Sequence, residues 1–220
     1  MANSATETSV VIKADFWEAA WVNNRTGWDL GGATPALLSI LKSHEQVLFP
    51  TADATVLIPG VGRGYDVIAF AAKQGVKVVG LDISATGVAE AQKELTKANL
   101  VEDRAQVLVA DFFEYKAPPY SVVFDHTFLC AIDPSLRQAW ASKMAELVAE
   151  GGHLICYMFP IRELDDAGPP YALSVELYES LLTPAFERVF QRDLDLNEMP
   201  VSGMDRDKHG KQMISLWKRV

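Results

Sequence analysis

The stretch TVLIPGVGRGYD, residues 55–66, decides the fold of this chain. It opens with a short aliphatic run, which is typical of a buried strand, and continues through three glycines into a helical pattern. Because Gly60, Gly62 and Gly64 carry no side chains, the turn can approach a ligand at the N-terminus of the next helix. We expect a strand, a ligand-binding turn and a helix here. The alternative is a tight turn that binds nothing.

Four more aliphatic runs follow along the chain: VKVVGLD (76–82), AQVLVAD (105–111), SVVFDH (121–126) and HLICYMF (153–159). The segments between them carry helical patterns at residues 65–74, 85–99 and 135–150. Strands that alternate with helices of this length indicate an α/β fold, with a parallel sheet and helices on both faces.

The two ends of the chain add further elements. A helix is expected at residues 174–182, followed by strands at 185–192 and 212–217. The short return NEMPVSGMD between these strands predicts an antiparallel edge.

At the other end, residues 1–12 are polar and predicted to be disordered. Asp15 is a candidate N-cap for a short aromatic helix, and Thr34-Pro35 begins a second helix.

Composition excludes several classes of protein. The chain has 220 residues and no linker, so one domain over residues 1–220 is expected. A net charge of −9 argues against a nucleic-acid groove, and no apolar run is long enough to span a membrane. Two cysteines and four histidines show no metal-ligand spacing, and the N-terminus shows no secretory signal. We therefore expect a cytoplasmic protein without a metal, acting on a small molecule as a monomer or weak dimer.

Carboxylates follow two of the expected strands. Asp82 ends its strand 22 residues after Gly60, where doubly wound nucleotide folds place an acid that binds ribose hydroxyls. Asp111 ends the next strand, and with the backbone N–H of Phe112 it offers groups for an adenine edge. For Asp111, a helix cap is an equally good explanation.

The type of nucleotide follows from charge. The pattern is G-x-G-x-G rather than the dinucleotide G-x-G-x-x-G, and no P-loop lysine follows it. Asp66, near the N-terminus of the next helix, would repel a pyrophosphate but suits a cationic ligand. The pattern favours S-adenosylmethionine over a nicotinamide dinucleotide.

From Asp15 to Arg219 the chain resembles the halide/thiol (thiocyanate) methyltransferases of the thiopurine S-methyltransferase superfamily. The resemblance rests on FWEAAWVNNRTGWDLGGATP, VLIPGVGRGYDV, VVGLDIS, ADFFEY, FDHTFLCAIDPSLRQAW, GPPY and LWKR. It implies a Rossmann-like class I S-adenosylmethionine-dependent methyltransferase. The expected fold is a mostly parallel seven-stranded sheet with an N-terminal helical lid over residues 13–45.

The resemblance also implies which residues bind the cofactor. His126 stands where plant members usually have tyrosine, so a hydroxyl contact is lost or replaced by imidazole. With His126, the expected cofactor-binding set is Trp17, Trp21, Trp28, Gly60, Gly62, Asp82, Asp111 and Phe112.

Three tryptophans lie within residues 17–28. They form either a packed aromatic cluster or a lid that excludes water and lays ring faces near a sulfonium. The resemblance favours the lid.

Substrate chemistry follows from the positive sulfur. A halide, thiocyanate, hydrosulfide or thiolate can displace the methyl group in line in a dry pocket, so no catalytic base is expected. Arg137 could attract an anion or be a solvated helix residue, and Tyr171 could face the pocket or anchor its loop. An amine, carboxylate or oxygen nucleophile is the alternative, with His126 and Asp125 as candidate bases. A binding protein without turnover also stays open.

Overall fold

A computed structural model describes residues 14–100, 102–165, 167–195, 197–199 and 210–220. Seven strands form one sheet in the order β3-β2-β1-β4-β5-β7-β6. Strands β1 to β5 pair in parallel, and β7 runs antiparallel to both β5 and β6. The strands are β1 Thr55–Pro59, β2 Lys77–Asp82, β3 Ala105–Val109, β4 Tyr120–His126, β5 Val148–Ile161, β6 Phe186–Asp193 and β7 Lys211–Arg219.

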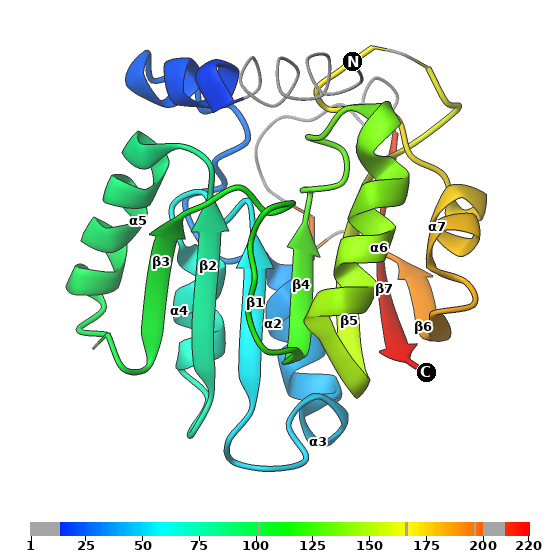
Figure 1. Cartoon of the computed structure of the whole chain (residues 1–220), viewed down its shortest axis with the longest axis horizontal. Helices are drawn as coiled ribbons and strands as arrows, with labels where there is room; N and C mark the ends of the chain where they lie inside the picture. Colours follow the sequence, from blue (N-terminus) through cyan, green and yellow to red (C-terminus); the bar gives the residue numbers. More distant parts are fainter. Residues whose placement is uncertain (1–13, 101, 166, 196, 200–209) are drawn as a thin grey trace, which may run out of the picture.

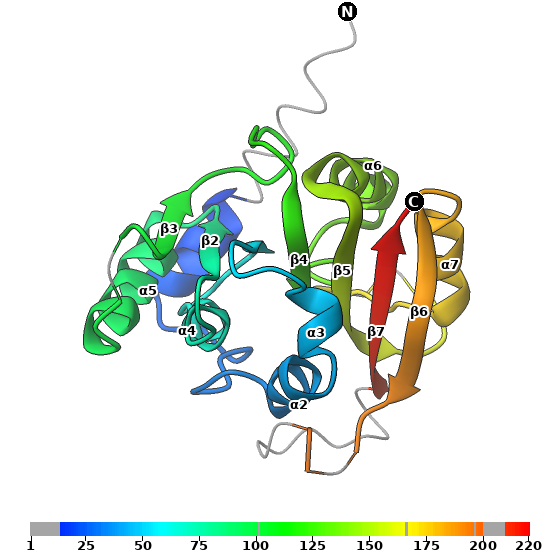
Figure 2. The ribbon, with the colours of Figure 1, turned by 90° about the horizontal axis from the view of Figure 1, so that it is seen from below.

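Helices cover both faces of the sheet (Figure 2). Helices α2, α4 and α5 lie on one face, and α6 and α7 lie on the other. The helices are α2 Pro35–Ser43, α3 Glu45–Leu48, α4 Tyr65–Ala71, α5 Ala85–Lys97, α6 Arg137–Leu147 and α7 Val175–Leu182, with a 3-10 turn η1 at Pro134–Leu136. A further helix over residues 14–22 lies beyond the carboxyl ends of the parallel strands (dark blue in Figure 1).

Strand β1 shows how the sheet forms two cores. Its side chains alternate between the faces, as the two-residue period of a strand requires. Val56 and Ile58 are buried with Phe70 and Phe124 in one apolar cluster. Leu57 is buried in a second cluster, which contains the largest buried side chains on the other face. Among them are Trp140, Tyr178 and Trp217.

The strand order places the ligand crevice. The chain winds outward from β1 to β2 and β3 on one side, then returns to β4 on the other side of β1. In doubly wound sheets, ligands bind beyond the carboxyl ends of the strands at this reversal. The glycine turn after β1 and the ends of β2 and β4 meet there.

Several element boundaries differ from the sequence-based expectation. Helix α4 ends at Ala71, and α6 begins at Arg137 after a 3-10 turn. Strand β5 starts at Val148 because its pairing with β4 shifts register and accommodates the extra residues. Asp15 lies inside the N-terminal helix, which already includes residue 14, so it is not the N-cap.

Some predictions concern residues that the structure does not describe. These are the disorder of residues 1–12 and most of the return NEMPVSGMD. Within the described residues, no helix is both long and apolar enough to cross a membrane. The same residues contain no group of three or more metal-ligating side chains.

Candidate cofactor and substrate site

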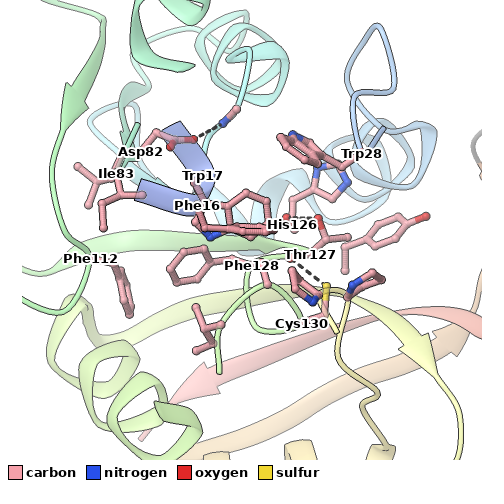
Figure 3. Close-up of a pocket in the computed structure, with 18 of the residues that line it drawn as sticks. Phe16, Trp17, Trp28, Asp82, Ile83, Phe112, His126, Thr127, Phe128 and Cys130 are labelled. Atoms are coloured by element: carbon pink, nitrogen blue, oxygen red, sulfur yellow. Dashed lines mark hydrogen bonds between the residues drawn. The ribbon is translucent and has the colours of Figure 1, made fainter. Parts of the chain in front are cut away.

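A cavity of about 510 Å³ lies at the carboxyl ends of β1, β2 and β4. Figure 3 shows aromatic rings filling its centre, with Asp82 and Trp28 on opposite sides. The predicted residues that line it are Trp17, Trp21, Trp28, Gly60, Gly62, Asp82, Asp111, Phe112 and His126. Residues distant in the sequence therefore meet around one cavity.

The glycine turn requires glycine for two reasons. Gly60 has φ +61° and Gly62 has φ +55°, which is left-handed backbone that side chains disfavour. A Cβ on Gly60 would also lie 2.6 Å from the ring of Phe128 across the cavity. The turn thus leaves room beside the aromatic wall that a side chain would fill.

Asp82 ties the glycine turn to the start of α5. Its Oδ2 accepts a hydrogen bond from the Gly62 N–H at 3.1 Å, and its Oδ1 accepts one from the Ser84 N–H at 2.9 Å. Burial raises the pKa of Asp82, and these backbone hydrogen bonds oppose the shift. A carboxylate has about four acceptor sites, so further acceptor capacity is left for a ligand in the cavity.

The position of Asp111, after β3, is compatible with both expectations for it, a local cap and a group that binds a ligand. Its Oδ1 accepts from the Phe113 N–H at 2.8 Å, which is the local turn geometry of a capping residue. It also lines the cavity, beside the buried ring of Phe112. That ring packs edge-on against Phe128, with centroids 5.1 Å apart.

The three tryptophans form an edge-to-face group over the cavity. Trp28 packs against Trp17 at 5.1 Å and against Trp21 at 5.9 Å between ring centroids. A Cβ on Gly87 of α5 would lie 2.8 Å from the Trp21 indole nitrogen, so Trp21 rests directly on α5. By contrast, α2 is buried in the sheet core and does not line the cavity. Of the segment 13–45 that was expected to be a lid, the residues that line the cavity lie between Phe16 and Leu30, and we call residues 14–30 the covering segment.

Two polar contacts that sequence reasoning missed hold this segment in place. Glu18 accepts hydrogen bonds from the Ser84 hydroxyl at 2.6 Å, from the Thr86 N–H at 3.1 Å and from the Thr86 hydroxyl. These hydrogen bonds lower the pKa of Glu18. Glu18 therefore binds the free N–H end of α5. No local sequence pattern marks it, because its partners lie 66 and 68 residues away.

Arg63 is the second contact. It lies inside the glycine turn, forms ion pairs with Asp29 and with Glu90, and stacks over Trp21 at 5.2 Å. The hydrogen bond to Asp29 is the main cause that raises the pKa of Arg63. The sequence did contain a signal for this contact, because Arg63 lies between two glycines of the turn.

Asp125, a candidate base under the alternative of an amine or oxygen substrate, does not line the cavity. It is fully buried on the α6 side of β4 and accepts hydrogen bonds from Phe128 N–H, Leu129 N–H and the Trp140 indole. Burial raises the pKa of Asp125 to about 6. It organises the loop after β4.

His126 points to the opposite face, as the alternation of a strand requires. Its Nδ1 lies 2.7 Å from Oδ2 of Asp66, and its ring packs between Phe124 and Tyr157. Asp66 was expected to act on a cationic ligand from the N-terminus of α4. Instead it lies behind His126, outside the cavity lining.

Arg137 and Tyr171 also lie outside the lining. The Arg137 guanidinium donates to the Ala172 carbonyl at 2.8 Å, and burial lowers its pKa. The Tyr171 backbone N–H donates to the Cys130 carbonyl at 2.8 Å. Both residues hold the 168–172 loop in place, and Pro169 and Pro170 of that loop face the cavity instead.

The lining carries few charges. Among the described lining residues there is no lysine or arginine, and the acidic and imidazole side chains are those of Asp82, Asp111 and His126. Burial raises the pKa of Cys130 and of Tyr157, so both stay protonated. An aromatic cavity with two carboxylates and no lysine or arginine fits a nucleoside that bears a positive sulfur and no phosphate.

Comparison with known proteins assigns the family. The family model for thiopurine S-methyltransferase matches residues 12–219. The chain belongs to this family. It is 39% identical to "Probable thiol methyltransferase 2" of Arabidopsis thaliana, over 86% of this chain and 81% of that protein. It is 35% identical to "Thiocyanate methyltransferase 1" of Brassica oleracea, over 95% of this chain and 87% of that protein.

Solved structures agree on the fold of this thiopurine S-methyltransferase family member. A Burkholderia thailandensis 1,6-didemethyltoxoflavin-N1-methyltransferase with bound S-adenosylhomocysteine has a TM-score of 0.71 at 16% identity, covering 100% of this chain and 92% of that one. Magnesium protoporphyrin IX methyltransferase from Synechocystis with bound S-adenosylmethionine has a TM-score of 0.69 at 15% identity, covering 94% of this chain and 97% of that one. The protein is therefore an S-adenosylmethionine-dependent methyltransferase of the class I fold, as the sequence predicted.

Proposed function

We propose that this enzyme transfers the methyl group to a small anionic or thiol nucleophile: a halide, thiocyanate, hydrosulfide or thiol. When bound, S-adenosylmethionine supplies an electrophilic methyl group on a positively charged sulfur. The names of the relatives, which specify thiol and thiocyanate substrates, support this class of nucleophile. We include halides in this class of nucleophile because, like thiocyanate, they carry a single negative charge and react without losing a proton.

The absence of lysine and arginine from the described lining carries the proposal. A cationic side chain would pair with the incoming anion and reduce its reactivity. In its absence, the anion is attracted mainly by the sulfonium itself, and their charges cancel as the bond forms. Such a reaction is favoured where water is excluded, and the aromatic cover over residues 14–30 supplies that exclusion.

We further propose how the residues of the cavity bind the cofactor. Asp82 accepts from the ribose hydroxyls, and Asp111 and the Phe112 N–H meet the adenine edge. The aromatic faces of the tryptophans lie near the sulfonium. The full set is Trp17, Trp21, Trp28, Gly60, Gly62, Asp82, Asp111, Phe112 and His126.

The pH dependence with iodide tests the proposal. Iodide carries no proton in water, so kcat/KM for iodide should not rise between about pH 6 and 9, where general bases such as imidazole become active. The measurement is methyl iodide formation at saturating S-adenosylmethionine. A rising step near neutral pH would contradict transfer without a base and would favour an amine or oxygen substrate.

A further inference from the structure

Burying the Asp66–His126 pair costs free energy, and a pair with only a structural role need not have this cost. Asp66 is 8% exposed, and its Oδ1 is buried without a hydrogen-bond partner. No described ion pair joins it to a lysine or arginine; His126 is its one polar side-chain partner in the described structure. Burying a carboxylate with so few partners is unfavourable. The arrangement therefore points to a function of the imidazole that Asp66 supports.

The carboxylate also fixes which imidazole nitrogen is free. An ionised carboxylate only accepts hydrogen bonds, so Nδ1 of His126, 2.7 Å from Oδ2, carries the proton. Nε2 has no hydrogen-bond partner among the described residues. His126 lines the cavity, and because Nδ1 is turned to Asp66, Nε2 is the ring nitrogen left to meet a ligand there. In a neutral ring, Nε2 is then a proton acceptor.

The aromatic rings packed against the imidazole carry no charge. Phe124 of β4 stacks on the ring at 5.6 Å, and Tyr157 of β5 lies at 4.9 Å. The Tyr157 hydroxyl donates to Gln212 of β7, and burial raises its pKa. Asp125, next in the chain, lies on the other face of the sheet, and it interacts electrostatically with His126 from there. From helix α4, Asp66 is the charge that faces the ring.

We propose that His126 accepts the proton of a neutral thiol substrate and that Asp66 positions it to do so. The proposal rests on the proposed function and narrows it to protonated thiols. The S–H bond breaks, the proton moves to Nε2, and the electron pair stays on sulfur, which then forms the bond to the methyl carbon. The imidazolium releases its proton to solvent after the product leaves. Alkyl thiols resemble cysteine, with a pKa near ~8.5, so most are protonated at neutral pH and need such an acceptor.

The tautomer of His126 can be read without turnover. In ¹⁵N NMR of the labelled protein without substrate, the neutral ring should be protonated at Nδ1, with the signal assigned by its loss in His126→Phe. Asp66→Asn should shift the ring toward the Nε2–H form. A wild-type ring protonated at Nε2, or doubly protonated up to pH 9, would overturn the proposal, because such a ring cannot accept a proton.

Kinetics supply the second test. The quantity measured is the ratio of kcat/KM for 2-mercaptoethanol to kcat/KM for iodide, so that shared losses in folding or cofactor binding cancel. At pH 7 the ratio should fall about 100-fold in His126→Phe, at the lower end of general-base effects, and about 10-fold in Asp66→Asn. The deficit should shrink above the pKa of the thiol. His44→Phe, a histidine outside the cavity, should keep the wild-type ratio.

The outcomes separate the two claims. Ratios within threefold of wild type in both variants at every pH would overturn the role of His126. A wild-type enzyme that methylates neither iodide nor the thiol would instead contradict the proposed function.

Discussion

Asp82 serves two tasks with one carboxylate. Its two oxygens accept the N–H groups of Gly62 and Ser84, which hold the glycine turn against the start of α5. The same carboxylate lines the cavity, where we propose that it accepts the ribose hydroxyls. Its spacing from Gly60 made the position predictable, because Gly60 directly follows β1 and Asp82 ends β2, the neighbouring parallel strand.

Asp82→Asn should weaken S-adenosylmethionine binding about 10- to 100-fold. An amide keeps the shape but replaces a charged acceptor, and a hydrogen bond to a charged group is worth ~1.5–3 kcal/mol. Calorimetric titration measures the affinity, and Asp103→Asn, at an exposed site, is the matched control. Affinity equal to wild type in Asp82→Asn would remove Asp82 from the binding site.

At the scale of an element, one buried ring and a few polar contacts attach the N-terminal segment. Trp21 is buried against α5, but Phe16 is 47% exposed and Trp28 is 39% exposed, and Glu18 and Arg63 make the polar contacts. A segment whose large apolar side chains are partly exposed opens at a lower free energy than the core. Residues 14–30 are therefore suited to open and close over the cofactor.

Hydrogen exchange over residues 14–30 should slow when S-adenosylhomocysteine binds, and Glu18→Gln should speed it in the free protein. Hydrogen bonds lower the pKa of Glu18, so its contribution is present above the ordinary value of 4.5 and is lost as the pH falls below it. Helix α2, buried in the core, is the internal control. Identical exchange with and without ligand would show that the tryptophans only pack.

The loop after β4 carries a pH dependence of the opposite sign. Burial raises the pKa of Asp125 to about 6, above the ordinary 3.8, so the folded chain holds this proton more tightly than the unfolded chain. The contribution of Asp125 to stability is therefore largest below pH 3.8 and falls as the pH rises to about 6, by about 3 kcal/mol. Urea unfolding of wild type and Asp125→Asn from pH 4 to 7.5 should show the difference between them change by this amount. A difference that stays constant with pH would be the contrary result.

At the scale of the whole molecule, the alternation of strands and helices predicted the sheet, its antiparallel edge and the meeting of Gly60, Asp82 and Asp111. Contacts between distant segments were not predictable, because no local pattern reports them. Asp66 and His126 are 60 residues apart in the sequence. The two-residue period of β4 did offer a signal that was missed: Asp125 and His126 are neighbours in one strand, so they face opposite sides of the sheet.

Product analysis with a panel of nucleophiles tests the central claim most directly. The purified enzyme is incubated with S-adenosylmethionine and, in separate reactions, with iodide, bromide, thiocyanate, hydrosulfide, a thiol, an amine and a carboxylate, and methylated products are quantified by chromatography. We predict methyl halide, methyl thiocyanate or methyl thioether well above the enzyme-free background, with the amine and carboxylate at background. Methylation of the amine or carboxylate, with no product from any halide, thiocyanate, hydrosulfide or thiol, would contradict the account.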